Sequence, residues 1–287
     1  MELSDLPRDL IIAILHFMDH TSLLQLEIVN RHVRDIILHG DMWEVLAQRL
    51  ALYEYKCRIR SWKRLVLLTQ SPVNLEFSVL RQVRECSSVD HINESADNTL
   101  TRSHCDIGVT LLHTMAVADD PVQFVAMAKR LQRVCGCARE QPCYWSSAST
   151  WECTSTDHLD YVLWENCLVN SVQIVPYRVF WYPDSPTYAP KRLSFALYEL
   201  GDDDEVETLV YESITYCIAN DMKMETFELP RRAFLSRGIL RLNLFDRQED
   251  VSSSVARWMQ EFNLPPYYTC LSYVGVTGLL EFELSLE

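Results

Sequence analysis

The sequence predicts a multidomain α+β protein in which a group of three short helices and a helical linker precede an antiparallel β-sandwich. Three observations favour this fold class. Up to about residue 85 the apolar residues keep helical spacing, residues 87–104 are polar, and after Cys143 apolar and polar residues alternate. Because the helical pattern comes first and the strand pattern later, we expect separate domains: 1–50 for the three-helix module, 51–86 for the linker and 87–287 for the sandwich.

The helices of the first part are short and closely joined. The first is expected to open at Pro7, since a proline there lacks only an N–H that has no helical partner. The second is expected to begin at Thr21 or Ser22, either of which can cap it. Phe77 to Arg84 is expected to close the helical part. Their apolar positions are Leu10, Ile11, Ile14, Leu15, Met18, Leu23, Leu26, Val29, Val33, Ile36, Ile37, Trp43, Leu46 and Leu50.

A basic run at residues 56–64, KCRIRSWKR, interrupts this otherwise acidic protein. Trp62, Leu65 and Val66 continue the helical spacing through it, so the pattern favours a solvated helix face beside an apolar one over a dedicated anion site.

The second half of the chain has the period of strands, with one helix expected near 120–134. Leu193, Phe195 and Leu197 alternate with polar or small residues, and the segments LRLNLF and GLLEFELSLE repeat the pattern. Further strands are expected at 159–165, 170–176, 207–216 and 268–276. Seven or more strands separated by turn signals indicate an antiparallel sandwich or barrel.

Composition narrows the class of partner. The formal net charge is -14 at pH 7, and an anionic surface repels phosphate backbones and acidic membranes. We therefore expect neither nucleic acid nor membrane as a partner. The start, MELSDLPRDL, lacks the features of a signal peptide, which indicates a cytoplasmic or nuclear protein with reduced cysteines.

More than half of residues 6–50 are apolar, which exceeds what so small a module can bury by itself. The spacing of Leu6-Pro7, Leu10, Ile14-Leu15 and Met18, continued by Leu23-Leu24, Val29, Arg31, Arg34, Ile36 and Trp43, resembles the F-box, with Val33 standing where many members carry tryptophan. The resemblance implies docking onto a Skp-type adaptor and through it a cullin. By this resemblance Leu26, Val29, Ile36 and Trp43 hold the helices together. The implied adaptor-binding residues are Leu6, Pro7, Leu10, Ile11, Leu23 and Leu24.

The strings CYWSSAST at 143–150 and SPTYAPKRLSFAL at 185–197 are similar to plant-type F-box proteins whose second half is a galactose-binding-like β-sandwich of the jelly-roll type. The segment around Tyr188 and Lys191 also resembles Doc-homology domains. If the sandwich recognises a target, exposed aromatic residues on a loop are plausible contacts. The candidate substrate-binding residues are Phe180, Trp181, Tyr182, Asp184 and Tyr188. Tyr144 and Trp145 form a second cluster, and packing in the sandwich is the alternative for both.

Metal and catalytic motifs are weak. Cys135, Cys137, Cys143 and Cys153 lack the paired two-residue spacing of zinc knuckles, so no metal or other cofactor is expected, although the sequence leaves zinc open. We find no nucleophile elbow, no phosphate-binding glycine loop and no zinc-protease motif. A non-catalytic protein is therefore expected.

Together these features predict the substrate-recognition subunit of a Skp-cullin-F-box ubiquitin ligase, which holds an unknown target protein near the catalytic subunits. Two alternatives stay open. One is a carbohydrate-binding F-box protein that recognises glycosylated targets, and the other is an adaptor-binding scaffold that does not direct degradation.

Overall fold

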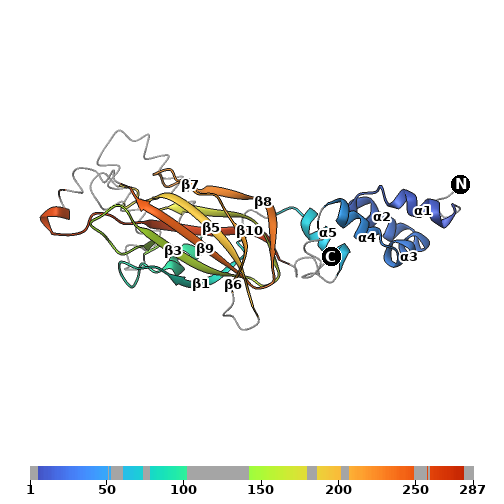
Figure 1. Ribbon diagram of the computed structural model, residues 1–287, viewed down its shortest axis with the longest axis horizontal. Coiled ribbons are helices and arrows are strands. Elements are labelled where there is room, and N and C mark those ends of the chain that lie inside the picture. The colour runs from blue at the N-terminus through green and yellow to red at the C-terminus, as the bar shows by residue number, and fades with distance from the viewer. Residues whose placement is uncertain are drawn as a thin grey trace. The chain divides into compact units, whose positions relative to one another are not determined.

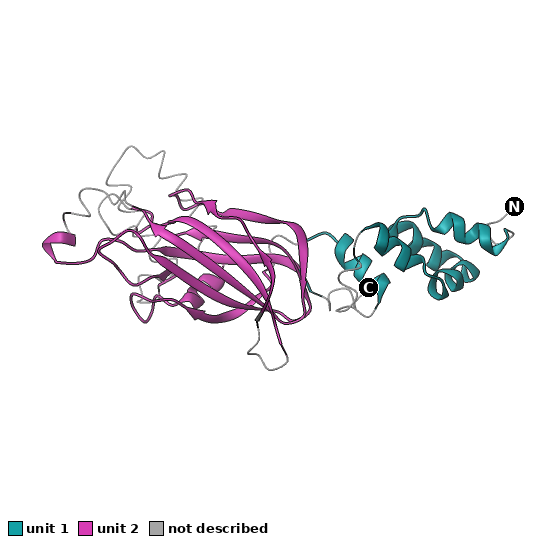
Figure 2. Ribbon diagram, viewed as in Figure 1, with its two compact units in different colours: residues 1–73, 279–287 teal, residues 74–278 magenta. Residues whose placement is uncertain are grey.

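The computed structural model describes residues 6–50, 52, 61–73, 78–101, 142–179, 186–201, 207–248, 257 and 259–280. The chain divides into two compact units, one formed by residues 1–73 with 279–287 and the other by residues 74–278 (Figure 2). The first is helical and the second contains two antiparallel β-sheets (Figure 1). The predicted fold class is therefore confirmed.

The helical unit contains α1 (Arg8–Leu15), α2 (His20–Val29), α3 (Arg31–His39), α4 (Met42–Arg49) and α5 (Trp62–Gln70). Asp19 caps α2 by accepting a hydrogen bond from the Ser22 amide at 2.8 Å. The prediction that Thr21 or Ser22 caps this helix is therefore wrong, because both lie within its first turn. Asn30 caps α3 in the same way. The core includes Ile11, Leu15, Leu23, Val33, Ile36, Ile37, Met42, Trp43, Leu46, Leu65, Val66 and Leu68.

A buried carboxylate joins three helices of this unit. Glu27 of α2 accepts a hydrogen bond from Nε1 of Trp43, in α4, at 3.0 Å and forms an ion pair with Lys63, in α5. The Lys63 ammonium also lies 5.5 Å from the centre of the Trp43 ring. Through these contacts α5 is linked to α2 and α4. Most of the residues between α4 and α5 lie outside the described part of the chain.

We expect Glu27→Ala to lower the free energy of unfolding of the helical unit by about 1–3 kcal/mol, the cost of leaving a buried donor without its acceptor. Glu27→Gln keeps an acceptor for Trp43 and should cost less. The measurement is urea unfolding followed by circular dichroism at the helical band, with the exposed Asp35→Ala in α3 as the control. Equal stability of the wild type and Glu27→Ala would show that the cluster is not stabilising.

The sandwich unit contains a six-stranded and a four-stranded sheet, both antiparallel. The first has the order β1-β3-β9-β5-β6, with β7 also paired to β5, and the second has the order β2-β10-β4-β8. The strand bounds are β1 Leu80–Cys86, β2 Trp145–Ser146, β3 Thr156–Leu163, β4 Cys167–Pro176, β5 Pro190–Leu200, β6 Glu207–Glu212, β7 Tyr216–Cys217, β8 Glu225–Leu235, β9 Gly238–Arg247 and β10 Cys270–Leu280.

The period-two pattern marks the core-facing positions of the central strands. Leu240, Leu242 and Leu244 of β9 are buried, and so are Leu193, Phe195 and Leu197 of β5. The two strands pair directly, with Leu193 opposite Leu244 and Leu197 opposite Leu240. The predicted alternation is confirmed for β9, whose Arg241 and Asn243 are only half-buried, but not for β5, where Ser194 and Ala196 are buried as well.

The helical prediction for residues 77–84 is wrong from Leu80 onward, because that stretch is part of β1. Its backbone pairs with β3, with Leu80 opposite Leu163 and Val83 opposite Tyr161. Two register shifts in this pair blur the alternation that would have indicated a strand in the sequence. The tertiary pairing overrides the local helical spacing.

The polar segment that begins at residue 87 belongs to the sandwich unit over its described part, residues 87–101. Ala96 and Thr99, in the 3₁₀ helix η3 (Ala96–Leu100), are buried. The Thr99 hydroxyl lies 2.7 Å from the buried Tyr161 hydroxyl of β3. The segment therefore packs as a structured loop. The helix expected near 120–134 and residues 281–287 of the last predicted strand lie outside the described residues.

Candidate functional sites

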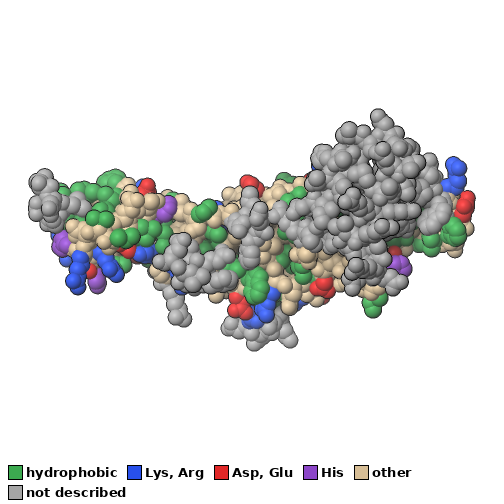
Figure 3. All heavy atoms as spheres, turned by 180° about the vertical axis from the view of Figure 1, so that it is seen from behind, with side chains coloured by type: hydrophobic (Ala, Val, Ile, Leu, Met, Phe, Trp, Pro, Cys, Tyr) green, Lys and Arg blue, Asp and Glu red, His purple; other side chains and the backbone are tan. Residues whose placement is uncertain are grey.

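Helix α1 carries apolar residues on two faces. Ile11 and Leu15 are buried against the helical unit, whereas Leu10 and Ile14 are 53% and 39% exposed, and Phe17 in the following turn is 85% exposed. With the exposed Pro7, these residues form one surface, which we call the α1 stripe: Pro7, Leu10, Ile14 and Phe17. Residues three or four apart are neighbours on a helix surface, so the stripe is continuous. Figure 3 shows hydrophobic side chains on the surface of the helical unit, at the left of that view.

The turn that presents Phe17 is anchored from a distant helix. Nη1 of Arg49, at the end of α4, donates hydrogen bonds to the carbonyl oxygens of His16 at 2.8 Å and Met18 at 3.3 Å. Such bonds satisfy carbonyls that a helix end leaves without helical partners. Because the two carbonyls flank Phe17, Arg49 fixes the backbone on both sides of this exposed ring.

The structure separates the six predicted adaptor-binding residues into two groups. Pro7 and Leu10 are exposed and Leu6 and Leu24 are half-buried, so all four offer surface to a partner. Ile11 and Leu23 have no exposed area in this conformation, and their contact with an adaptor stays a prediction. Their side chains fill the space beneath the surface.

Val29 was expected to hold the helices together, and this expectation is wrong, because Val29 is 81% exposed at the end of α2. Its neighbour Ile28 is 85% exposed. The cap residue Asn30 turns the chain into α3 directly after them, so neither side chain packs inward.

A second candidate site is a pocket of about 270 Å³ in the sandwich unit, where β4 ends and β5 and β10 begin. Its lining includes Asp90, Glu94, Tyr144, Ser146, Tyr188 and Tyr268. Backbone hydrogen bonds hold three of the wall segments side by side: the Tyr188 amide donates to the Tyr177 carbonyl at 3.1 Å, and the Cys270 amide donates to the Tyr188 carbonyl at 2.8 Å. We call this cavity the sandwich pocket.

Two carboxylates line the sandwich pocket. Glu94 is 9% exposed, and one of its oxygens accepts a hydrogen bond from the Tyr144 hydroxyl at 2.7 Å. Burial raises the pKa of Glu94 and, separately, the pKa of Asp90 above their ordinary values. The negative charge of Asp90 raises the pKa of Glu94 further, which indicates that the two groups repel one another when both are ionised.

Tyrosine rings form much of the remaining wall. Tyr144 stacks on Tyr177 with ring centres 4.2 Å apart and an interplanar angle of 10°. Tyr188 and Tyr268 meet edge to face, with ring centres 5.6 Å apart. These contacts fix the ring orientations before any ligand arrives, and fixed aromatic surface binds at low entropic cost.

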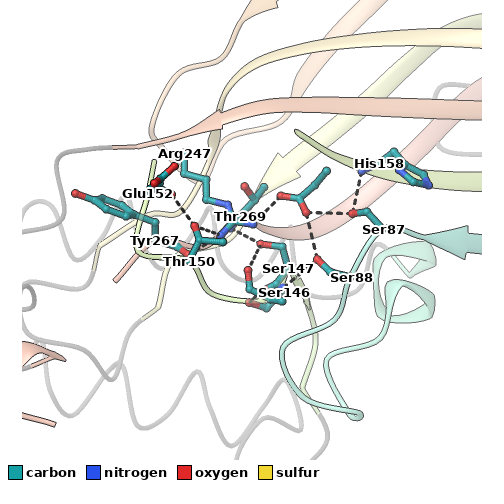
Figure 4. A network of polar contacts seen from close by, with 12 residues as sticks. Ser87, Ser88, Ser146, Ser147, Thr150, Glu152, His158, Arg247, Tyr267 and Thr269 are labelled. Carbon is teal, nitrogen blue, oxygen red and sulfur yellow. Dashed lines mark hydrogen bonds and ion pairs between the residues drawn. The ribbon is translucent and has the colours of Figure 1, made fainter. Parts of the chain in front are cut away.

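A polar network, drawn in Figure 4, includes Ser146, which also lines this pocket. Asp157 of β3 and Arg247 of β9 form an ion pair at 3.0 Å, with side chains 7% and 3% exposed. The other Asp157 oxygen accepts hydrogen bonds from the Ser87 and Ser88 hydroxyls. Arg247 also donates to the Thr150 hydroxyl and the Tyr267 carbonyl, both at 2.8 Å.

The network fastens the loop that carries the pocket carboxylates. The Ser88 hydroxyl accepts a hydrogen bond from the Ala148 amide at 3.1 Å, and the Asp90 amide donates to the Ser146 carbonyl at 3.0 Å. Because Ser146 pairs with Cys270 at the start of β10, the loop is tied to the four-stranded sheet as well as to β3. The pocket is thus built on fixed elements.

Of the five predicted substrate-binding residues, the structure places one in the sandwich pocket. Tyr188 lines the wall and is 2% exposed. Phe180, Trp181, Tyr182 and Asp184 lie outside the described residues. In the second aromatic cluster, Trp145 is fully buried in β2, whereas Tyr144 lines the pocket.

Asp90, Glu94 and Tyr268 were not predicted as site residues from the sequence. The available signal was weak: acidic residues in a polar segment that otherwise reads as a linker, and a tyrosine pair at 267–268 before a strand. Among the four cysteines considered for zinc, Cys143 is buried and Cys153 half-buried, while Cys135 and Cys137 lie outside the described residues. No group of three or more metal-ligating side chains occurs within the described ranges.

The first helices belong to a known domain class. Residues 3–44 match the family model of the F-box domain, so the chain carries an F-box, as its sequence resemblance implied. An F-box implies a substrate-adaptor role in a Skp-cullin-F-box ubiquitin ligase and binding to a Skp-type adaptor, and F-box proteins are generally non-catalytic. No match was found among the curated proteins.

Several solved structures are similar to the sandwich unit in outline. Chitosan-binding module 1 of a chitosanase/glucanase from Paenibacillus sp. IK-5 is 10% identical with a TM-score of 0.37, over 70% of this chain and 98% of that one. XRCC1 bound to the DNA polymerase β catalytic domain is 12% identical with a TM-score of 0.38, over 71% and 97%. A family 32 carbohydrate-binding module from Clostridium perfringens NanJ, in complex with galactose, is 12% identical with a TM-score of 0.28, over 47% and 75%. At these TM-scores the likenesses assign no ligand to this chain.

Within the part of the chain that the structure describes, no helix is both long enough and apolar enough to cross a membrane.

Proposed function

We propose that this protein is the substrate-recognition subunit of a Skp-cullin-F-box ubiquitin ligase, in which the F-box binds the adaptor and the β-sandwich presents the target. The observation that carries the proposal is the α1 stripe, an exposed apolar surface within the residues that match the F-box. An exposed apolar surface of this kind is typical of a protein interaction site. The adaptor contacts that we propose are Leu6, Pro7, Leu10 and Leu24, joined by Ile14 and Phe17.

The sandwich supports the second half of the proposal. It has a pocket with fixed walls, lined by aromatic rings and carboxylates from several segments of the fold. Its role in a ligase needs no catalytic group, because holding a target near the ubiquitin-transferring subunits raises the effective concentration of the reacting groups. The target is a protein that the pocket and its surroundings recognise.

The test is reconstitution with purified components. The full chain is co-expressed with a Skp-type adaptor, and complex formation is measured by size-exclusion chromatography before and after addition of cullin. We expect a one-to-one complex with the adaptor that recruits cullin. A chain that elutes alone would contradict the proposal.

The scaffold alternative predicts a different result in a second assay. Candidate targets are captured from cell extract by the assembled ligase and by the same ligase without this chain, and their ubiquitination is followed with added ubiquitin-activating and conjugating enzymes. A receptor directs ubiquitin onto the proteins it captures. A scaffold binds adaptor and captured proteins alike but leaves the proteins unmodified.

A further inference from the structure

We propose that the sandwich pocket binds a positively charged side chain, arginine or lysine, of the target protein. The inference rests on the proposed function, since it names the chemistry by which the receptor reads its target. The pocket has a volume of about 270 Å³, just below the usual range for small-molecule sites. A cavity of this size suits one side chain or one small organic group.

The charge in the pocket favours a cation. Asp90 and Glu94 both line it, and His91 is the one basic residue among the described lining residues. The nearby Arg247 is engaged by Asp157 at 3.0 Å and by two further acceptors. His91 Nε2 lies 3.7 Å from a carboxylate oxygen of Asp90 and offsets that charge only when the imidazole is protonated. No described residue forms an ion pair with Glu94, so its charge is left for a ligand to compensate.

Glu94 gives the more specific indication. Glu94 as a residue is 9% exposed, and the Tyr144 hydroxyl donates a hydrogen bond to one of its two carboxylate oxygens. The structure provides the other oxygen with no hydrogen-bond donor from the described residues. A buried carboxylate is costly unless it is paired, so a ligand that brings a donor and a positive charge relieves that cost.

The aromatic wall suits the same ligand. Tyr144, Tyr188 and Tyr268 line the pocket together with the two carboxylates. Cations are attracted to the faces of aromatic rings, and a guanidinium both stacks on rings and forms two parallel hydrogen bonds to a carboxylate. A neutral sugar could also stack on these rings, but it leaves the charge of Asp90 and Glu94 uncompensated. The net charge of -14 additionally attracts basic targets at long range.

The experiment uses the full chain in complex with its Skp-type adaptor and four small probes: N-acetyl-arginine methylamide, the lysine analogue, the neutral isostere N-acetyl-citrulline methylamide, and galactose. Binding is measured by nuclear magnetic resonance titration observed on the probe. We expect the arginine or lysine probe to bind and the citrulline probe and galactose to bind at least tenfold more weakly. Equal binding of arginine and citrulline, or binding of galactose alone, overturns the inference.

Two substitutions locate the binding. Glu94→Gln removes the charge yet keeps an acceptor for the Tyr144 hydroxyl, so the fold should persist, and we expect at least a tenfold loss of affinity for the charged probe. Glu228→Gln makes the same change at an exposed position of β8 that does not line the pocket, and it should have no effect. Equal thermal midpoints of both variants show that folding is unaffected, and an unchanged affinity of Glu94→Gln overturns the inference.

The adaptor complex separates this inference from the proposed function. If the adaptor co-elutes but no charged probe binds, the pocket inference fails while the receptor assignment stands. If the adaptor does not co-elute, the titration is repeated on the full chain alone; charged probes that bind there show that the receptor assignment fails and the pocket is a cation site of a protein with another role.

The affinity for the charged probe should fall as the pH is lowered from 7.5 to 5.5. Burial raises the pKa of both Asp90 and Glu94, so these carboxyl groups take up protons at a higher pH than ordinary ones and lose the charge that attracts a cation. The other charged groups that act on them are His91 and Arg247. A protonated His91 repels a cationic probe, so its protonation also lowers the affinity as the pH falls. An affinity that does not change over this range contradicts a role for the two carboxylates.

Discussion

Asp157→Ala is expected to lower the free energy of unfolding of the sandwich unit by about 3–5 kcal/mol, the usual cost of removing one partner from a buried ion pair. Asp157 and Arg247 are both almost fully buried. Without Asp157 the guanidinium keeps its hydrogen bonds to Thr150 and Tyr267 but loses its counter-charge, and the hydroxyls of Ser87 and Ser88 lose an acceptor. The measurement is urea unfolding followed by tryptophan fluorescence. Trp145 is a suitable probe because it is buried and donates to the Ser88 carbonyl at 3.0 Å.

The control is a second ion pair that differs in burial. Asp246 and Arg192 lie 2.6 Å apart, but their side chains are 26% and 52% exposed. Exposed pairs contribute between zero and about 1 kcal/mol, so Asp246→Asn should change the stability little. Asparagine is chosen because Asp246 has a φ of 57°, a left-handed conformation that asparagine tolerates and alanine does not. The double variant Asp157→Leu with Arg247→Met should recover part of the loss, since apolar residues of similar size can replace a buried pair. Equal effects of Asp157→Ala and Asp246→Asn would contradict a larger contribution of the buried pair.

The sequence could predict a strand where one face of the strand is apolar and where the strand pairs with its neighbour without a register shift. Strand β9 meets both conditions, with Leu240, Leu242 and Leu244 in register with β5. Strand β8 does not meet both conditions and was not predicted. It contains Pro230, and its pairing with β4 shifts register in that region, between the Val169–Ala233 and Ser171–Glu228 pairs. A proline is tolerated there because β8 is the edge strand of its sheet.

The helical part shows a different limit. Its spacing correctly indicated three short helices with more apolar surface than they can bury, but in α1 and α2 apolar residues point in nearly every direction. Periodicity does not then say which residues are covered. Ile11 is buried and Leu10 exposed, although they are adjacent and similar in character. Only the packing of the other helices against α1 and α2 decides between them, and for Val29 it reversed the expected assignment.

The sandwich pocket could not be predicted as a site because its residues come from segments far apart in the sequence. Asp90 and Glu94 lie in the loop before η3, Tyr144 precedes β2, and Tyr268 precedes β10. The β-sheet topology, which a single sequence does not specify, brings them together. Tyr188 was named as a candidate because it stands in an aromatic-rich loop, and that signal was enough to find one wall of the pocket.

Leu10→Asp is expected to weaken adaptor binding at least about 30-fold, which corresponds to the roughly 2 kcal/mol that defines an interface hot spot. Leu10 is 53% exposed in the middle of the α1 stripe, so the fold tolerates a carboxylate there, whereas an apolar interface that covers it must bury an unpaired charge. The measurement is isothermal titration calorimetry with a purified Skp-type adaptor, accompanied by circular dichroism to show that the helices persist. The milder double variant Leu6→Ala with Pro7→Ala should weaken binding in the same direction, because it removes apolar area at the edge of the same surface.

Two comparisons make this test specific. Ile214→Asp introduces the same charge at a 72% exposed isoleucine of the sandwich unit and should leave adaptor binding unchanged. Ile11→Asp places the charge at a fully buried position and should instead unfold the helical unit, so its loss of binding would be accompanied by loss of helical signal. If Leu10→Asp stays folded and binds the adaptor as tightly as Ile214→Asp does, the α1 stripe is not the adaptor surface. The exposed pair Ile28 and Val29 at the end of α2 would then be the next surface to test, because at 85% and 81% these two side chains are far more exposed than Leu38, at 48%, within the residues that match the F-box.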